Sequence, residues 1–104
     1  MRAKPRGWLE PNVNLMETKW RMVRLRDNET AHRFEIGDGG DIVFADYRRS
    51  GDRLYIDHVE APIHLRGTGA AGRLMEAIVA QADAEARTIV PICGYAAAWL
   101  KRRG

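Results

Sequence analysis

Residues 65–84 read LRGTGAAGRLMEAIVAQADA, in which a glycine-rich loop runs directly into an amphipathic helix. Apolar residues recur at the i, i+3, i+4 spacing of a helix that runs from about Gly69 to about Ala86. They are Ala71, Leu74, Met75, Ile78, Val79, Ala82 and Ala86. A helix N-terminus presents unpaired N–H groups and the positive end of the helix dipole, and glycines let a ligand come close to the backbone. The segment therefore predicts a binding site for a phosphate or pyrophosphate.

Four segments with the alternating pattern of β-strands precede this loop: residues 22–26, 30–36, 41–47 and 53–60. Polar and glycine-containing turns separate them, at residues 27–29, 37–40 and 49–52. In the fourth segment, simple alternation predicts that Leu54, Ile56 and His58 share one face of the sheet. The opposite face would then carry Tyr55, Asp57 and Val59.

The apolar run after the helix, residues 88–92, is expected to be a buried fifth strand, parallel to the fourth because a helix connects them. Pro91 predicts an early end of this strand or its splaying from the fourth, which would open a slot bordered by His58 and Cys93. Residues 94–103 predict a short closing helix. The expected fold is α+β: a mixed, mostly antiparallel sheet of about five strands, with a crossover helix after the fourth strand and a short C-terminal helix.

The composition, with 45% hydrophobic and 30% charged residues in 104, is that of one soluble domain. Residues 1–20 are expected to be a weakly ordered N-terminal extension, and residues 21–104 a minimal domain. A single cysteine and the lack of a signal-peptide pattern predict a cytoplasmic protein. The histidines and the cysteine lack zinc-site spacing, so no metal is expected. No apolar run approaches the roughly 18 residues of a membrane helix.

The net charge of +3 is concentrated at the chain ends, whereas residues 29–100 carry seven basic and eleven acidic residues. This distribution argues against a basic face for nucleic acid. Gly67, Gly69 and Gly72 match the dinucleotide-binding fingerprint, but that loop belongs after the first strand of a βαβ unit, and residues 88–96 lack the acidic residue expected for a ribose. A P-loop is excluded because no Gly-Lys-Ser/Thr is present.

The arrangement Arg66-x-x-Gly69-x-Ala71 is more informative, because it resembles the (Q/R)-x-x-G-x-(G/A) signature of the GNAT N-acetyltransferase superfamily. Three further segments are similar to a small single-domain GNAT-like family with an RFE…H-x-x-x-P…RG-x-G…P-x-C-x-Y pattern. They are RFE at 33–35, HVEAP at 58–62 and PICGY at 91–95. The sequence departs from that family at Val59, where threonine is usual.

The resemblance implies a protein that binds acetyl-coenzyme A and transfers acetyl to an unidentified amine, on a small molecule, a protein lysine or an N-terminus. The backbone amides that would hold the pyrophosphate are those of Arg66, Gly67, Thr68, Gly69, Ala70 and Ala71. The strand end formed by Val59, Glu60 and Ala61 would pair with the pantetheine arm. Two alternatives stay open: a coenzyme A or acyl-CoA binding module without efficient turnover, and a small interaction module that only inherits the fold.

Three residues are candidates for catalysis of acyl transfer. His58 is the natural general base, with Glu60 or Asp57 acting through a water as alternatives. Cys93 is either a nucleophile that accepts the acetyl group or a lining residue of the thioester pocket, and Tyr95 is the candidate proton donor to the leaving thiolate. Each also has a purely structural interpretation: a hydrogen-bonded histidine, an inert cysteine and a packed tyrosine.

Overall fold

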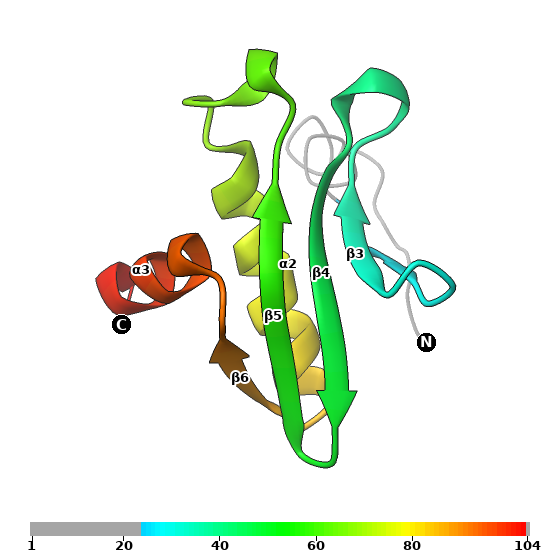
Figure 1. The fold of residues 1–104 in the computed structure, drawn as a ribbon, viewed down its shortest axis with the longest axis vertical. Coiled ribbons are helices and arrows are strands. Elements are labelled where there is room, and N and C mark those ends of the chain that lie inside the picture. The colour runs from blue at the N-terminus through cyan, green and yellow to red at the C-terminus, as the bar shows by residue number, and fades with distance from the viewer. Residues whose placement is uncertain (1–23, 104) are drawn as a thin grey trace, which may run out of the picture.

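The computed structural model describes residues 24–103, and it is an α+β fold, as expected (Figure 1). One five-stranded sheet has the order β2-β3-β4-β5-β6, antiparallel except for β6, which is parallel to β5. Its strands are β2 (Arg26–Asn28), β3 (Arg33–Ile36), β4 (Val43–Ser50), β5 (Arg53–Glu60) and β6 (Thr88–Pro91). The helices are α2 (Ala70–Ala84) and α3 (Gly94–Arg103), and short 3-10 turns span Gly39–Asp41 and Ile63–Leu65. The expected extension over residues 1–20 lies outside the described residues.

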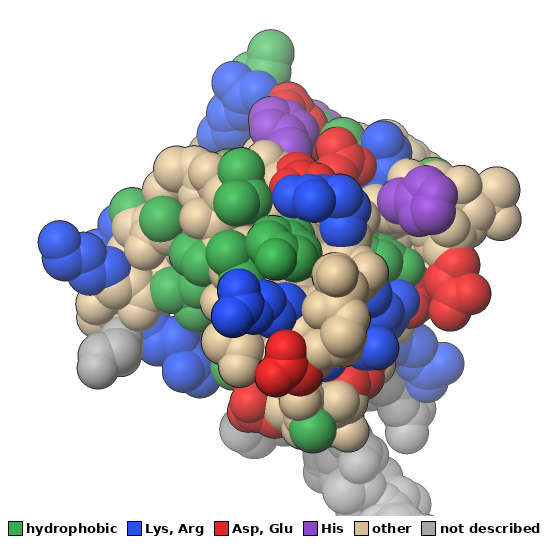
Figure 2. Space-filling view, turned by 60° about the horizontal axis from the view of Figure 1, so that its bottom comes forward, with side chains coloured by type: hydrophobic (Ala, Val, Ile, Leu, Met, Phe, Trp, Pro, Cys, Tyr) green, Lys and Arg blue, Asp and Glu red, His purple; other side chains and the backbone are tan. Residues whose placement is uncertain are grey.

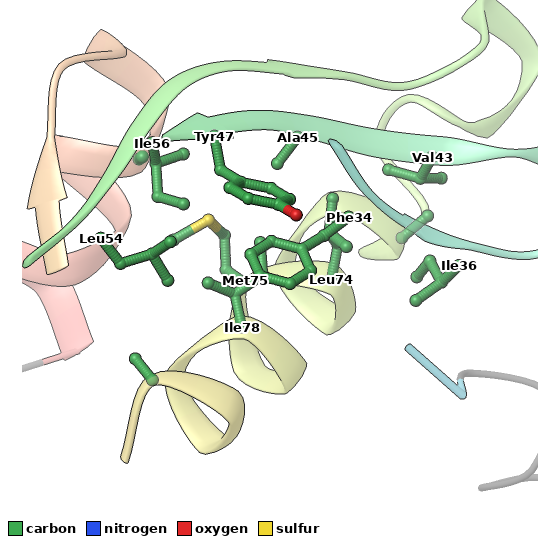
Figure 3. Close-up of a cluster of buried hydrophobic side chains, with 13 residues drawn as sticks. Phe34, Ile36, Val43, Ala45, Tyr47, Leu54, Ile56, Leu74, Met75 and Ile78 are labelled. Carbon is green, nitrogen blue, oxygen red and sulfur yellow. The ribbon is translucent and has the colours of Figure 1, made fainter. Parts of the chain in front are cut away.

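Helix α2 is the predicted crossover helix, and its apolar stripe covers one face of the sheet. Figure 3 shows Leu74, Met75 and Ile78 of α2 pointing toward Phe34 and Tyr47 of the sheet. All thirteen side chains of this buried cluster are at most 4% exposed. Neither α2 nor α3, the described helices, is long and apolar enough to cross a membrane.

The ends of α2 differ slightly from the prediction, for conformational reasons. Gly69 is the N-cap and has the left-handed φ of +87°, so the helix begins at Ala70. Ala86 has a φ of +56°, and the Arg87 N–H bonds to the Ala82 carbonyl at 2.9 Å. A residue in the left-handed conformation, followed by an N–H that bonds to the carbonyl five residues earlier, terminates a helix. Ala86 therefore lies beyond the helix, although it continues the apolar spacing.

A β-bulge in β5 overturns the predicted alternation. His58 pairs with Asp46 of β4, and Ile56 pairs with Tyr47, the next residue of β4. Asp57, between Ile56 and His58, therefore has no partner residue in β4 and is an extra residue in β5. One extra residue reverses the facing of every side chain beyond it. Leu54 and Ile56 point into the core, while His58 lies with Asp46 on the sheet face opposite α2. The prediction that His58 shares a face with Leu54 and Ile56 is wrong.

Other corrections concern the sheet edges. Asp27 and Asn28, predicted in a turn, lie in β2, which pairs with β3; the Asp27 side chain bonds to Tyr47 of β4 and the Asn28 side chain to Glu35 of β3. β4 continues through Ser50, so the hairpin turn is shorter than predicted. β6 is not the buried strand expected, since its residues are half-buried or exposed at the sheet edge. It does end early, at Pro91, as predicted.

Arg49 ties β4 to β2 and to the end of α2. Its Nη2 lies 2.8 Å from Asp27 Oδ2 and 2.7 Å from Glu85 Oε2, and its Nε donates to Glu85 Oε1 at 2.9 Å. The Arg49 hydrogen bonds, aided by Gln81 and Arg87, hold the pKa of Glu85 at about 2. Burial and the hydrogen bond to Asp27 raise the pKa of Tyr47 to about 12.

This cluster predicts a specific loss of stability in acid. The ordinary pKa of Glu85 is 4.5, so its folded-state pKa is depressed, and its contribution is present above about pH 4.5 and is lost as the pH falls toward 2. The wild type should lose about 2 kcal/mol of unfolding free energy over this range through Glu85, less than the roughly 3 kcal/mol of the full shift because solvent reaches part of the group. Urea titrations of wild type and Glu85→Gln across this pH range measure the difference.

The matched control is Glu76→Gln, because Glu76 lies in α2, of which Glu85 is the C-cap, but is 60% exposed and 3.4 Å from Arg103. Its pH dependence should follow that of the wild type. Parallel curves for wild type and Glu85→Gln would contradict the prediction.

Candidate functional site

The loop between β5 and α2 is built from hydrogen-bonded turns and two left-handed glycines. The Leu65 N–H donates to the Pro62 carbonyl at 2.9 Å, and the Thr68 N–H to the Leu65 carbonyl at 3.2 Å. Gly67 and Gly69 have φ values of +83° and +87°, which L side chains rarely adopt. The predicted glycine-rich loop is therefore an ordered turn whose shape depends on these two glycines.

The first turn of α2 directs backbone N–H groups out of the helix end. The first bond of the α-helical ladder runs from the Arg73 N–H to the Gly69 carbonyl at 3.0 Å, so Ala71 and Gly72 precede it. The Ala70 N–H meets Thr68 Oγ1 at 3.3 Å. The first turn of α2 contains no acidic residue. Such a terminus is suited to an anion.

Two arginines flank this loop. The Arg66 Nη2 lies 3.3 Å from Glu60 Oε2, and its Nε donates to the Ala61 carbonyl at 3.3 Å. The Arg73 Nη1 donates to the Thr68 carbonyl at 3.4 Å. Both side chains are exposed, and their charges add to the positive end of the helix dipole.

Next to the loop, the end of β5 pairs with a strand on one side only, within the described part of the chain. β6 pairs with β5 only from Arg53 to Ile56, and the chain then turns into α3, with the N–H groups of Ile92 and Cys93 both bonding to the Ile56 carbonyl. His58–Glu60 pair with β4 alone in the described part of the chain, and β5 extends past β6 in Figure 1. Such an edge can receive an extended ligand. The predicted pantetheine residues Val59, Glu60 and Ala61 lie here.

Cys93 and Tyr95 lie where β6 gives way to α3. The Cys93 carbonyl accepts from the Ala97 N–H at 3.0 Å, which makes Cys93 the N-cap of α3. Cys93 is half-buried and packs against the hydrophobic cluster. Tyr95, in the first turn of α3, is 39% exposed, and the neighbouring Ile92 is 57% exposed.

His58 occupies a different environment, on the sheet face opposite α2. Its Nε2 lies 2.8 Å from Glu60 Oε1, and its ring forms a T-shaped pair with Phe44, 6.4 Å between centroids. Among residues 24–103, no hydrogen bond joins any two of His58, Cys93 and Tyr95. The structure thus brings Cys93 and Tyr95 together on one segment and separates them from His58, because the bulge turns His58 away from the core.

The same sheet face carries charged groups that pair with one another. Arg48 forms two 2.8 Å hydrogen bonds with Asp57, and Arg33 lies 3.5 Å from Asp46. Figure 2 shows acidic and basic side chains bordering each other around hydrophobic ones. Arg48 and Arg33 thus lie close to carboxylates of this face, as Arg66 lies close to Glu60, whereas Arg73 donates to a backbone carbonyl of the loop.

Sequence reasoning singled out Glu60 but did not anticipate its two contacts, and it missed Arg73 at the loop. The Glu60 carboxylate contacts both His58 and Arg66, and Arg73 returns to the loop from the first turn of α2. The i, i+2 spacing of His58 and Glu60 on a strand is the sequence signal that could have found the first contact. The spacing of four residues between Gly69 and Arg73 is the signal for the second.

A family model described as GCN5-related N-acetyl-transferase matches residues 33–104, which include the loop, the end of β5 and the segment around Cys93. No curated protein matches the chain.

Proposed function

The chain belongs to the GCN5-related N-acetyltransferase family, which indicates acyl transfer, and we propose that it moves acetyl from acetyl-coenzyme A to an amine. The observation that carries the proposal is the loop of residues 66–71. It places backbone N–H groups at the start of α2, beside the edge of β5 and between two arginines. A Cβ at Gly67 would meet nothing within 4 Å, so this side of the loop is open to a ligand. These features fit a pyrophosphate joined to an extended chain.

In the proposed binding mode, Arg66, Gly67, Thr68, Gly69, Ala70 and Ala71 surround the pyrophosphate, and the edge at Val59, Glu60 and Ala61 pairs with the pantetheine arm. The N–H groups of Arg66 and Thr68 bond to the Ile63 and Leu65 carbonyls and so shape the turn. Bound acetyl-coenzyme A supplies a thioester as the acyl donor. His58 takes the proton of the amine, and later releases it to solvent, while the nitrogen lone pair forms the C–N bond and the C–S bond breaks. Tyr95 gives its phenolic proton to the thiolate and recovers one from solvent, so the products are an amide and coenzyme A.

Direct transfer to the amine is better supported than an acetyl-cysteine route. Cys93 packs against the hydrophobic cluster, and His58 lies on the other side of β5. A nucleophilic cysteine needs a neighbouring base or positive charge to form its thiolate. We therefore propose that Cys93 lines the thioester pocket from the α2 side of the sheet, whereas His58 acts on the amine from the opposite face.

Cys93→Ala should retain acetyl transfer, whereas His58→Ala should lower kcat by roughly 10²-fold, the lower end for a positioned base because His58 is exposed. Calorimetry with acetyl-coenzyme A, followed by thiol release with small amines, lysine peptides and free peptide N-termini, measures both steps. Binding without release for any acceptor would favour the binding module. If the wild type does not bind acetyl-coenzyme A, the proposal is overturned. If incubation with acetyl-coenzyme A, without an amine acceptor, leaves an acetyl group on Cys93, the reaction proceeds through an acetyl-cysteine and not by direct transfer.

A further inference from the structure

The Glu60 carboxylate uses its two oxygens for partners from different elements. Oε1 lies 2.8 Å from Nε2 of His58, two residues earlier on the same face of β5. Oε2 lies 3.3 Å from Nη2 of Arg66, which begins the loop. One carboxylate therefore connects the candidate base to the candidate anion site.

The ionisation of Glu60 decides which nitrogen of His58 carries the proton. The hydrogen bond with His58, with a further contribution from Arg66, holds the pKa of Glu60 below its ordinary value. An ionised carboxylate only accepts hydrogen bonds, so Nε2 of His58 must donate. In the neutral ring, Nδ1 then carries the lone pair.

We propose that Glu60 is a positioning residue: it fixes the Nε2–H tautomer of His58 and thereby makes Nδ1 the atom that accepts the amine proton. Arg66 holds the other carboxylate oxygen, so the orientation of Glu60 depends on the loop. The catalytic meaning of this role rests on the proposed transferase function, whereas the tautomer can be measured without any ligand.

The other groups around His58 leave this role to Glu60. Asp46, directly opposite on β4, is 3.5 Å from Arg33, and the Phe44 ring forms a T-shaped pair with the imidazole. Asp57, the bulge residue, binds Arg48 through both of its oxygens. Asp46 and Asp57 thus pair with arginines, and among residues 24–103 Glu60 is the carboxylate that hydrogen-bonds to the imidazole.

The first experiment records imidazole ¹⁵N spectra of the ligand-free protein at a pH where the rings are neutral. The wild type should show His58 predominantly as the Nε2–H tautomer. Glu60→Gln should show both tautomers, because an amide both donates and accepts. Asp46→Asn, a carboxylate variant on the same face, should leave the spectrum of His58 unchanged. His64, whose Nε2 lies 2.7 Å from Asp41, is an internal reference.

A wild-type Nδ1–H tautomer, or an unchanged Nε2–H tautomer in Glu60→Gln, would overturn the inference.

The second experiment is steady-state kinetics. Glu60→Gln should lower kcat on the order of tenfold, part of what a positioned base supplies, while KM for acetyl-coenzyme A changes by less than about twofold. If the wild type transfers acetyl and Glu60→Gln shows no fall in kcat, the role of Glu60 is refuted while the proposed transferase function stands. A wild type that binds no acetyl-coenzyme A refutes the proposed function and, with it, that role.

Discussion

Replacing Gly69 with valine should abolish the binding of acetyl-coenzyme A while the sheet, α2 and α3 stay folded. Gly69 has a φ of +87°, which a β-branched residue adopts only under strain, and its Cβ would lie 3.4 Å from Arg73 Nη1. The loop must therefore shift, and its N–H groups lose their alignment. Charge-assisted hydrogen bonds contribute about 1.5–3 kcal/mol each, so losing two weakens binding by at least roughly 10²-fold. Isothermal calorimetry measures the loss.

Gly51→Val is the matched control for this experiment. Gly51 also has a positive φ, of +60°, and a Cβ there would meet nothing within 4 Å. It lies in the hairpin between β4 and β5, at the opposite end of β5 from the loop. Gly51→Val should cost a similar conformational free energy and keep wild-type affinity. Unchanged affinity in a folded Gly69→Val variant would remove the loop from the binding site.

Replacing Phe34 with alanine should produce the largest loss of stability among these variants, about 3–5 kcal/mol of unfolding free energy. Phe34 is fully buried and stacks on Tyr47 at 4.3 Å between ring centroids. Its removal leaves a cavity against α2 and withdraws the support of Tyr47, which bonds to Asp27 and Arg49. Urea denaturation monitored by circular dichroism measures the change.

Phe44→Ala is the control, because Phe44 lies on the adjacent strand but on the opposite face. Phe44 is half-buried, and the Arg33 guanidinium lies 3.8 Å from its ring centroid. Losing that contact should cost about 1 kcal/mol. Equal losses in the two variants would contradict the assignment of the sheet faces.

The sequence by itself determined the elements whose signals are local. The apolar spacing of α2, the glycines of its loop and the turn residues between strands depend on neighbours a few positions away. The loop of residues 66–71 could be predicted for the same reason, because its N–H groups come from one continuous segment. The parallel pairing of β6 with β5 followed from the connecting helix alone.

Tertiary structure decided which residues meet across elements. The bulge at Asp57 depends on the register with β4, and the alternating sequence of β5 contains no sign of it. That single extra residue places His58 on the sheet face opposite α2, beside Glu60, and separates it from Cys93. Likewise, Asp27 and Asn28 have turn-forming side chains, but bonds to Tyr47 and Glu35 hold them in β2. Strand register and long-range hydrogen bonds are set by the partner strand, so residues far apart in sequence determined these contacts.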